Sequence, residues 1–406
     1  HAKGACIPLD RVLSLADITL KSNFGSESGM TNLLSDLDVI DRIFEHIDRN
    51  STDLGDEVWY EPTANYTCPE RFAAELELFK RIPLPFCPSA ALAKAGDYVA
   101  RNAAGVPIIA VRGEDGRVRA FRNACRHRGM KMADGSGCAK ALVCGYHGWV
   151  YALDGSLDYI PDAHGFPGFD KTKYGLVPVT AEERFGLVFV TQEEPVSDGA
   201  LADFPEALAP HQELVDANEF EFEMNWKLFA EAGMEGYHIK VGHPKSFYPY
   251  GFDNLNVIEP FGPNSRVTFP FRRIEKLRDV PREERRVDGK LTYAYQFFPN
   301  VLMAKLSRHT AVQFAEPLTP SRTKYIRYFL SNDPIEGDAE KLAMVKKDID
   351  YVSDTGNIED RDITVEIQKG LASGANEHFV YGHFEAAIVH FHKTMNELMP
   401  KVGWKE

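Results

Sequence analysis

Two short hooks of metal-ligating residues constrain this chain more than any other feature. The first hook holds Cys125 and His127 and the second holds Cys144 and His147, which gives the pattern C-x-H-x16-C-x2-H. Each hook offers one sulfur and one imidazole nitrogen, and a glycine follows shortly after each histidine. Glycine permits tight turns and close approach of the backbone to a bulky group. The pattern therefore predicts that both hooks hold one inorganic centre.

Two kinds of centre accept two Cys and two His ligands. Zinc sites of this composition usually pair cysteine with cysteine and histidine with histidine along the chain. In a Rieske [2Fe–2S] cluster two histidines replace two cysteines on one iron, so one iron takes both sulfurs and the other both nitrogens. Because each hook here mixes cysteine with histidine, the spacing favours the Rieske cluster, and zinc is the alternative.

Composition narrows the class of protein. The chain has 406 residues, of which 44% are hydrophobic and 26% charged, as in an ordinary globular protein with two or three domains. The net charge of −14 argues against nucleic-acid binding, which needs a basic surface. No apolar run approaches the ~20 residues of a membrane span. Two of the six cysteines belong to the hooks and the others show no disulfide framework, so we expect a cytoplasmic protein.

A second motif contains two histidines five positions apart, His238 and His243. On an ideal helix that spacing separates them by roughly 140°, so they converge only if the helix ends or bulges between them. Gly242 and Pro244 make such an end plausible. Two convergent histidines form two thirds of the 2-His-1-carboxylate triad that binds Fe(II). The competing interpretation is one core histidine and one surface histidine.

The third ligand of such a triad should be a carboxylate farther along the chain. Ile363, Ile367 and Leu371 recur at four-residue steps and predict the buried stripe of a helix. Asp360 lies three positions before Ile363 on that stripe, whereas the other nearby acidic residues fall on the polar face. A carboxylate on an apolar face is costly unless it is paired or metal-bound. This reasoning selects Asp360, with an Arg- or Lys-paired aspartate as the alternative.

These motifs together resemble the catalytic α subunit of Rieske non-haem iron oxygenases, the ring-hydroxylating type. The likeness runs from about residue 57 and includes both hooks, the segment Glu235-Gly-Tyr-His238-x4-His243 after Asn225-Trp-Lys, and Glu359-Asp360 at the head of a helix. It implies an α+β fold, with an antiparallel β Rieske domain and a helix-flanked antiparallel-sheet catalytic domain of the helix-grip type. It also implies two cofactors, a [2Fe–2S] cluster on Cys125, His127, Cys144 and His147, and a mononuclear Fe(II) on His238, His243 and Asp360.

The expected organisation has four segments. Residues 1–29 are a possible tag or extension, 30–90 an N-terminal helical segment that packs on the catalytic domain, 91–195 the Rieske domain, and 196–406 the catalytic mononuclear iron domain. Periodicity predicts helices at 33–49, 69–79, 225–240, 335–353, 357–372 and 383–399. The prolines at 83, 85 and 88 predict a rigid linker.

The resemblance also assigns a role to Glu235. In this family the cluster and the iron of one subunit are too far apart for ready electron exchange, and subunits usually form a head-to-tail trimer. A carboxylate three residues before the first iron histidine bridges the two metal sites across the subunit contact. Here that position is Glu235, which would connect His147 and His238. Many members carry Asp there, and Glu occurs in others, including some that oxidise quaternary amines.

Partners and substrate follow from the same likeness. The chain has neither a nucleotide-binding glycine-rich turn nor a plant-type ferredoxin cysteine run, so we expect a separate NAD(P)H-dependent reductase, with or without a ferredoxin. A homotrimer is expected, and a β subunit is an option. The expected reaction uses O2 to hydroxylate or dealkylate a small molecule, chiefly an aromatic compound. The alternatives are monooxygenation of a quaternary or methylated amine, since the aromatic residues in 247–300 also suit a cation–π cage, and electron transfer without oxygenase activity.

Overall fold

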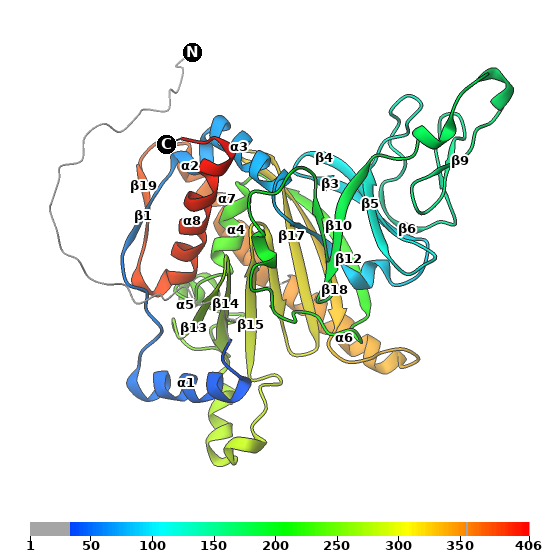
Figure 1. The fold of residues 1–406 in the computed structure, drawn as a ribbon. Helices are drawn as coiled ribbons and strands as arrows, with labels where there is room; N and C mark the ends of the chain where they lie inside the picture. The colour runs from blue at the N-terminus through cyan, green and yellow to red at the C-terminus, as the bar shows by residue number, and fades with distance from the viewer. Residues whose placement is uncertain (1–32, 355, 406) are drawn as a thin grey trace.

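The structure is a computed structural model that describes residues 33–354 and 356–405. The predicted extension at residues 1–29 lies outside the described residues. In the described part, two seven-stranded antiparallel sheets and a smaller three-stranded sheet form an α+β architecture, as expected. Figure 1 shows the first sheet projecting from the helix-covered second sheet. None of the described helices combines the length and the apolar character needed to cross a bilayer.

The first sheet carries the two Cys/His hooks. Its strand order is β2-β11-β10-β5-β4-β3-β6. The strands are β2 (Leu84–Pro88), β3 (Asp97–Ala103), β4 (Val106–Arg112), β5 (Val118–Arg122), β6 (Gly135–Cys138), β10 (Pro178–Arg184) and β11 (Leu187–Thr191). A three-stranded sheet continues from its end, formed by β7 (Leu142–Val143), β8 (Val150–Tyr151) and β9 (Leu157–Tyr159). The first hook therefore lies between β5 and β6, and the second lies between β7 and β8.

The predicted proline linker is wrong, because residues 84–88 form strand β2. β2 is an edge strand that pairs only with β11, and its register shifts between Val188 and Phe189. Proline cannot donate a ladder hydrogen bond, so it is tolerated at the edge of a sheet and at irregularities. The strand lies before residue 91, the expected start of the Rieske domain, and that boundary stays a prediction.

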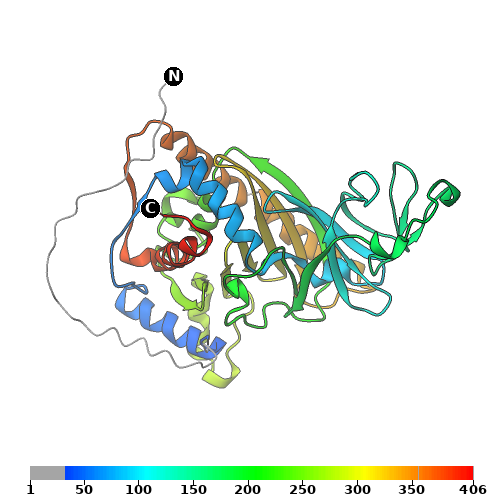
Figure 2. The same ribbon diagram turned by 45° about the horizontal axis from the view of Figure 1, so that its top comes forward.

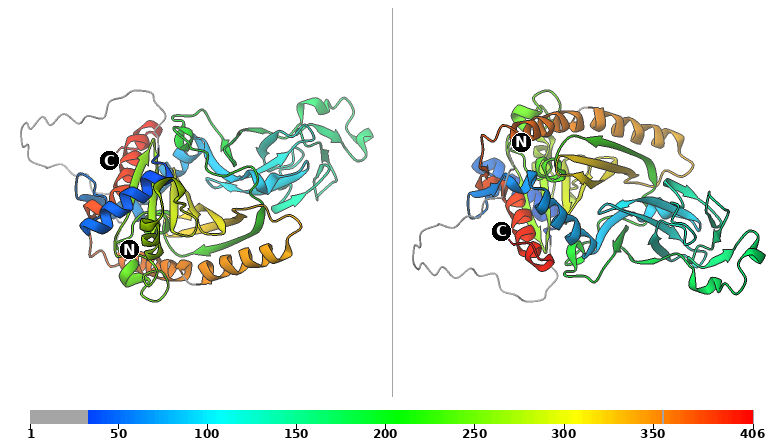
Figure 3. Two further views of the ribbon diagram at one scale, coloured as in Figure 1. Left: turned by 90° about the horizontal axis from the view of Figure 1, so that it is seen from below. Right: turned by 90° about the horizontal axis from the view of Figure 1, so that it is seen from above.

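The second sheet forms the larger part of the molecule. Its order is β12-β18-β17-β16-β15-β14-β13, a meander from β13 to β18 that β12 completes at the far edge. The strands are β12 (Leu214–Phe222), β13 (Val257–Phe261), β14 (Asn264–Pro270), β15 (Leu291–Phe297), β16 (Val301–Lys305), β17 (His309–Thr319) and β18 (Arg322–Ser331). Helices α6 (Ala339–Asp354) and α7 (Gly356–Leu371) run along one side of this sheet, as the orange ribbon in Figure 3 shows.

A short strand near the start of the described chain pairs with one near its end. β1 (Trp59–Pro62) pairs with β19 (His378–Tyr381), and the two strands lie side by side in Figures 1 and 2. Helices α1 (Asp36–Arg49), α2 (Ala64–Thr67), α3 (Pro69–Lys80) and α8 (Ala386–Leu398) complete this region. α1 buries Val39, Ile40 and Ile43 against the segment that follows β14. Its N-cap is Ser35, whose hydroxyl accepts from the Asp38 backbone N–H.

The two large sheets share one core. Leu84, Phe86 and Phe189 of the first sheet belong to the same buried cluster as Phe314 of the second. A buried ion pair crosses the junction, since Arg101 Nη1 lies 3.7 Å from Glu316 and the Gly105 N–H donates to Glu316 at 2.9 Å. Burial raises the pKa of Glu316, and the positive charge of Arg101 partly offsets this effect. The continuous core holds the hook-bearing sheet against the second sheet.

The prediction of one continuous helix at 225–240 is wrong. The structure has two short helices, α4 (Trp226–Ala232) and α5 (Ile239–Gly242), with turns between them. Gly233 ends α4, and a Cβ at Gly233 or Gly236 would lie within 2.5 Å of neighbouring side chains. The predicted helix end before His243 is confirmed, because α5 ends at Gly242.

Candidate metal centres and substrate pocket

The two hooks have the same turn geometry. In each, the cysteine N–H donates to a carbonyl five residues later, Cys125 to Met130 at 2.8 Å and Cys144 to Trp149 at 2.8 Å. A glycine four residues after each cysteine donates back to the cysteine carbonyl and has a positive φ, 77° at Gly129 and 71° at Gly148. Side chains other than glycine rarely adopt this conformation. The glycines after the histidines therefore shape both turns, as the sequence predicts.

The four hook side chains gather around one point. Cys125 and Cys144 are each 3% exposed, and the rings of His127 and His147 have their centroids 4.7 Å apart. The Nδ1 atoms of both histidines are buried and have no hydrogen-bond partner among the described residues. Buried polar atoms rarely remain unpaired. Two thiols and two free imidazole nitrogens are the donor set of a Rieske cluster, so the residues fit that group.

Neighbouring side chains hold these ligands in place. The His127 ring stacks on Trp149 at 4.8 Å with 5° between the planes. The Tyr151 hydroxyl lies 3.3 Å from Cys125 Sγ and accepts from the Arg126 N–H at 2.9 Å. On the outer side, Arg128 Nη2 lies 2.8 Å from His147 Nε2, while Tyr146 is exposed. His147 therefore has one nitrogen facing inward and the other facing the surface of the hooks.

The second candidate centre lies where α5 meets α7. His238 Nε2 is 3.1 Å from His243 Nε2 and 3.4 Å from Asp360 Oδ1, and His243 Nε2 is 2.8 Å from the same oxygen. The candidate ligand atoms of the three residues all lie within 4.8 Å of one another. The structure thus brings together the three side chains that the sequence proposed. Among the described residues, ion pairs join Asp360 to the two histidines and to no Arg or Lys, which disfavours the alternative of a paired aspartate.

The donor set fits a metal ion. Asp360 Oδ1 is buried and makes no hydrogen bond among the described residues, although two imidazole nitrogens lie close to it. Burial lowers the pKa of His238, but the neighbouring carboxylates of Asp360 and Glu235 outweigh this effect and raise the pKa to about 10. Two Nε2 atoms and one carboxylate, open on the remaining side, are the ligands of a facial triad.

Two further carboxylates orient the histidine rings. Glu235 accepts a short hydrogen bond from His238 Nδ1 and also accepts from the His238 backbone N–H at 3.1 Å. Glu359 Oε2 accepts from His243 Nδ1 at 2.7 Å and from the Ser246 hydroxyl. Each carboxylate leaves Nε2 of its ring free to bind a metal. The sequence reasoning assigned no such role to Glu359 or Ser246. One feature of the sequence could have indicated the role of Glu359. A metal-bound histidine needs a hydrogen-bond acceptor for its other nitrogen, and Glu359 is an acidic residue next to the candidate ligand Asp360.

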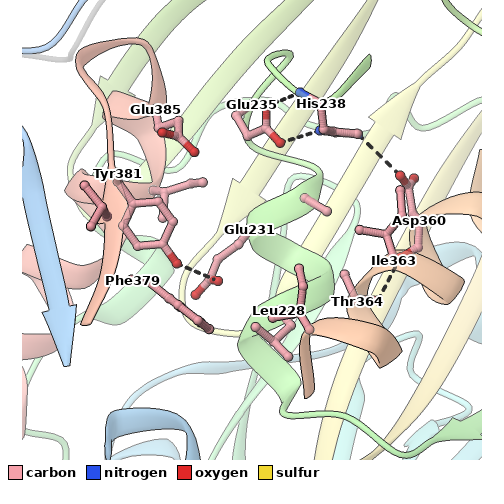
Figure 4. A pocket seen from close by; sticks show the side chains of 14 residues that line it. Leu228, Glu231, Glu235, His238, Asp360, Ile363, Thr364, Phe379, Tyr381 and Glu385 are labelled. Atoms are coloured by element: carbon pink, nitrogen blue, oxygen red, sulfur yellow. Dashed lines mark hydrogen bonds and ion pairs between the residues drawn. The ribbon is translucent and has the colours of Figure 1, made fainter. Parts of the chain in front are cut away.

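The predicted buried stripe on α7 is only partly right. Thr364 is 1% exposed, whereas Ile367 is 38% exposed. The reason is that Ile363 and Ile367 line a pocket of about 340 Å³ rather than the core. Figure 4 shows this pocket, with Asp360 and Ile363 of α7 facing the helix that carries Glu231.

The same pocket gathers three glutamic acids in addition to Asp360. Glu231, Glu235 and Glu385 line it together with His238. Burial raises the pKa of Glu385 to about 7, and the negative charges of Glu235 and Glu231 add to this effect, against the stabilising Gly382 N–H. Glu385 is therefore partly protonated near neutral pH.

A second, larger pocket opens on the other side of the triad. It has a volume of about 910 Å³ and is lined by His238, His243 and Asp360 at one end. Six aromatic side chains form much of its wall: Phe247, Tyr250, Phe252, Phe269, Phe271 and Tyr351. The Phe247 ring lies 4.8 Å from the His243 ring. A cavity of this size holds a small organic molecule next to the candidate metal site.

A buried polar network supports α4 from behind. Glu231 accepts from the hydroxyls of Tyr66 at 2.7 Å and Tyr381 at 3.0 Å, and it lies 3.0 Å from His392 Nε2. The other nitrogen of His392 lies 3.2 Å from Glu61, which is fully buried. Burial lowers the pKa of His392, but its bonds to Glu231 and Glu61 raise it to about 9. An imidazolium between two carboxylates therefore joins α8, α4 and β1.

We expect His392→Ala to lower the free energy of unfolding by about 3–5 kcal/mol, because it removes the imidazolium that lies between two buried carboxylates. The folded-state pKa of His392 is raised, so its stabilising contribution is complete below pH ~6.5 and is lost as the pH rises through about 9. Thermal unfolding of both proteins between pH 6.5 and 9.5 should show a gap that narrows with pH. Thr394→Ala is the control, because that hydroxyl bonds only the carbonyl of its own helix. A gap that stays constant would contradict the charge state assigned to His392.

Comparison with known proteins identifies both parts of the chain. Residues 83–170 match the family model of the Rieske [2Fe-2S] domain, and residues 211–401 match that of the ring hydroxylating alpha subunit catalytic domain. The two matches contain the two candidate metal sites respectively. The likeness therefore covers the segments that carry the hooks and the triad, and not only the general fold.

Individual relatives agree with these models. The oxygenase subunit of carnitine monooxygenase from Acinetobacter baumannii is 35% identical over 199 residues, covering 47% of this chain and 54% of that protein. The chloroplastic choline monooxygenase of Spinacia oleracea is 27% identical over 355 residues, covering 83% of this chain and 78% of that protein. The aligned part thus spans about half the length of the first of these relatives.

A solved structure shares the fold. A quaternary ammonium Rieske monooxygenase in complex with an inhibitor superimposes with a TM-score of 0.73 at 24% identity, covering 84% of this chain and 95% of that one. At this identity the likeness speaks for the fold alone. The two domain models, the relatives and the geometry of both sites lead to one conclusion: this chain belongs to the family of Rieske non-haem iron oxygenases, as a catalytic α subunit.

Proposed function

We propose that this protein is the oxygenase component that inserts one atom of O2 into a small quaternary or methylated ammonium compound. The proposal takes the alternative from the sequence in place of the aromatic compound expected first. The reason is that the relatives described above are monooxygenases named for carnitine and choline. The overall reaction would consume two electrons and two protons, with one oxygen atom entering a C–H bond and the other leaving as water.

The observation that carries this proposal is the aromatic wall of the 910 Å³ pocket. An ammonium ion is attracted to the negative faces of aromatic rings within about 6 Å, by roughly 0.5–2 kcal/mol for each good contact. Phe247 lies against the ring of His243, and Phe252, Phe269 and Phe271 line the same cavity. A trimethylammonium head among these rings would present its methyl groups beside the triad.

We propose that Cys125, His127, Cys144 and His147 hold the cluster and that His238, His243 and Asp360 hold the iron. When bound, the cluster passes electrons one at a time and the iron activates O2 beside the substrate. The protein's own part is to fix geometry. Glu235 and Glu359 hold the two imidazole rings through Nδ1, and the aromatic wall excludes water from the substrate.

We also propose a head-to-tail homotrimer in which Glu235 of one subunit meets His147 of the next. The arrangement of a single chain supports it, because β9 beside the hooks and α5 beside the triad lie at opposite ends of the molecule in Figure 1. Tyr237, Val241 and Val380, which surround the Glu235 side of the triad, are between 58% and 83% exposed, as expected for a surface that another subunit covers. A β subunit is not needed for this contact.

Electrons would come from a separate NAD(P)H-dependent reductase, with or without a ferredoxin. The exposed cations Arg126, Arg128, Lys131 and Lys140 surround the hooks of an acidic protein. A local basic patch would steer an acidic electron donor to the cluster side of the chain.

The test is O2 uptake by the holoenzyme with a surrogate reductase and NADH. Carnitine, glycine betaine and choline are compared with 3,3-dimethylbutanol, the uncharged carbon isostere of choline, and with benzoate and naphthalene. We expect coupled uptake and a hydroxylated or dealkylated product with at least one ammonium compound. We expect the kcat/KM for the isostere to be about 10-fold lower than that for choline. This factor is the equivalent of ~1.4 kcal/mol of cation–π attraction. Coupled oxidation of the aromatic compounds alone would overturn the proposal.

A further inference from the structure

The far wall of the substrate pocket differs in charge from the rest of the protein. Arg272, Arg273 and Arg308 all line this pocket, although the whole chain has a net charge of −14. Arg272 and Arg273 begin the 3₁₀ helix η5 (Arg272–Asp279), and Arg308 lies in the turn between β16 and β17. The triad forms another part of the lining of the same cavity. A substrate next to the triad can therefore reach guanidinium groups with its other end.

Arg272 is held in place without using its N–H donors. Its backbone N–H donates to the Tyr250 carbonyl at 2.7 Å, which fixes the main chain. Its guanidinium carbon lies 5.8 Å from the centroid of the Tyr248 ring and 5.4 Å from that of Phe252. Stacking on aromatic faces orients a guanidinium and leaves its planar edge free to bind a carboxylate. Arg272 is thus oriented for an anionic ligand before that ligand arrives.

Three other arginines nearby already have carboxylate partners. Arg266 pairs with Glu259 at 2.8 Å, Arg278 with Asp48 at 2.7 Å, and Arg282 with Asp41 at 2.6 Å. Within the described residues, neither a hydrogen bond nor an ion pair joins the Arg272 guanidinium to a carboxylate. Of the three arginines that line the pocket, Arg272 is the one whose guanidinium lies against two aromatic rings, whereas Arg273 also bonds the Ser307 hydroxyl.

The acidic residues in the pocket do not neutralise this wall. Asp348 bonds His309 Nδ1 at 2.9 Å, Asp360 faces the two histidines of the triad, and Glu235 accepts from His238 Nδ1. Asp288 and Asp333 remain, and neither forms an ion pair with the three arginines among the described residues. Three unpaired cations thus face two unpaired anions, so the wall keeps a positive excess.

We propose that Arg272 binds a carboxylate of the substrate, so that the enzyme takes zwitterionic trimethylammonium carboxylates in preference to cationic alcohols such as choline. This inference rests on the proposed function. The ammonium head would lie on the aromatic wall beside the triad, and the carboxylate would receive two parallel N–H bonds from Arg272. The distance between the two charged ends of the substrate then becomes a determinant of specificity.

The test compares trimethylammonium carboxylates with one, two and three methylenes between the charged groups against their primary amides. The amides keep the head and the length but lack the negative charge. Kd is measured by calorimetry on the anaerobic holoenzyme, and KM and kcat by O2 uptake. We expect the wild type to bind the best carboxylate about 10- to 100-fold more tightly than its amide. Arg272→Gln should raise Kd and KM for the carboxylate by a similar factor, with kcat and all amide constants within about 3-fold.

Arg286→Gln is the matched control. It removes one positive charge from the same segment, but Arg286 bonds the carbonyls of Glu283 and Arg285 outside the pocket. Metal content and circular dichroism of each variant establish that it is folded and loaded. If carboxylates and amides behave alike in the wild type, or if Arg272→Gln weakens both equally, the inference is wrong while the proposed function stands. If neither series supports coupled uptake while choline does, the inference is wrong and the proposed function stands. If choline also fails, both fail.

Discussion

Replacement of His238 by alanine should abolish substrate-coupled O2 uptake and leave the spectrum of the cluster unchanged. His238 supplies one of the three ligand atoms that lie within 4.8 Å of one another, so its loss leaves His243 and Asp360 alone. Even residues that only support metal ligands cost about 10- to 100-fold in affinity or activity when removed, and a ligand should exceed this. The hooks lie at the opposite end of the chain, so the cluster should not respond.

The measurement combines iron analysis, visible and EPR spectra, and O2 uptake on protein purified in parallel with the wild type. We expect loss of the mononuclear iron, retention of the [2Fe–2S] signals, and activity lower by at least about 100-fold. His211→Ala is a suitable control, because that exposed ring lies away from both candidate metal sites and bonds the Asn332 carbonyl at 2.9 Å. Undiminished coupled uptake in His238→Ala would show that oxygen is not activated at this site.

The second large effect is expected for Glu235→Gln, which should keep both metals yet stop electron transfer between them. One Glu235 oxygen accepts from His238 Nδ1, and the other accepts from the His238 backbone N–H. A glutamine amide has one accepting oxygen, which can still hold His238 and therefore the iron. Its NH2 group cannot accept from a second imidazole, so a bridge to His147 of a neighbouring subunit would be broken.

Stopped-flow oxidation of the pre-reduced cluster by O2 and substrate measures this step in a single turnover. We expect the rate to fall by about 100-fold or more in Glu235→Gln, with unchanged iron content. Glu385→Gln provides the comparison, because Glu385 lines the same pocket but bonds only the Gly382 N–H at 2.6 Å. A wild-type rate in Glu235→Gln would remove the bridging role and leave Glu235 as a support for His238 alone.

The cluster site was the most predictable part of the molecule because all its determinants are local. Two cysteines, two histidines and the glycines at 129 and 148 lie within 24 residues, and each hook closes through bonds inside its own turn. The alternation and turns around them also predict an antiparallel domain. What spacing could not show is the stacking of His127 on Trp149 or the contact of Arg128 with His147, which depend on how the two hooks meet.

The iron site was predictable in its ligands and less so in its surroundings. Asp360 was selected because a carboxylate on an apolar helix face needs a partner. This face lines a pocket, with Ile367 38% exposed, so the reason given for selecting Asp360 holds only in part, and its role as a ligand stays a prediction. The contact of Glu359 with His243 could not be predicted, because the two residues lie 116 positions apart in the sequence. The break between α4 and α5 was missed because continuous helical periodicity masked the crowding at Gly233 and Gly236.

Residue types and their local spacing are enough to predict the chemistry that this chain can support: which side chains offer sulfur, nitrogen and oxygen to metals, and which turns present them. The identity of candidate ligands depends on residue type and local spacing, so it can be predicted without a structure. The tertiary structure alone decided which groups share a cavity. It placed the aromatic residues after His243 beside the triad and set the hooks and the triad at opposite ends of one chain. Within the part of the chain that the structure describes, it also placed Arg272 against aromatic rings with no carboxylate partner. These relations join residues far apart in the sequence, and only the packing of the two sheets and their helices establishes them.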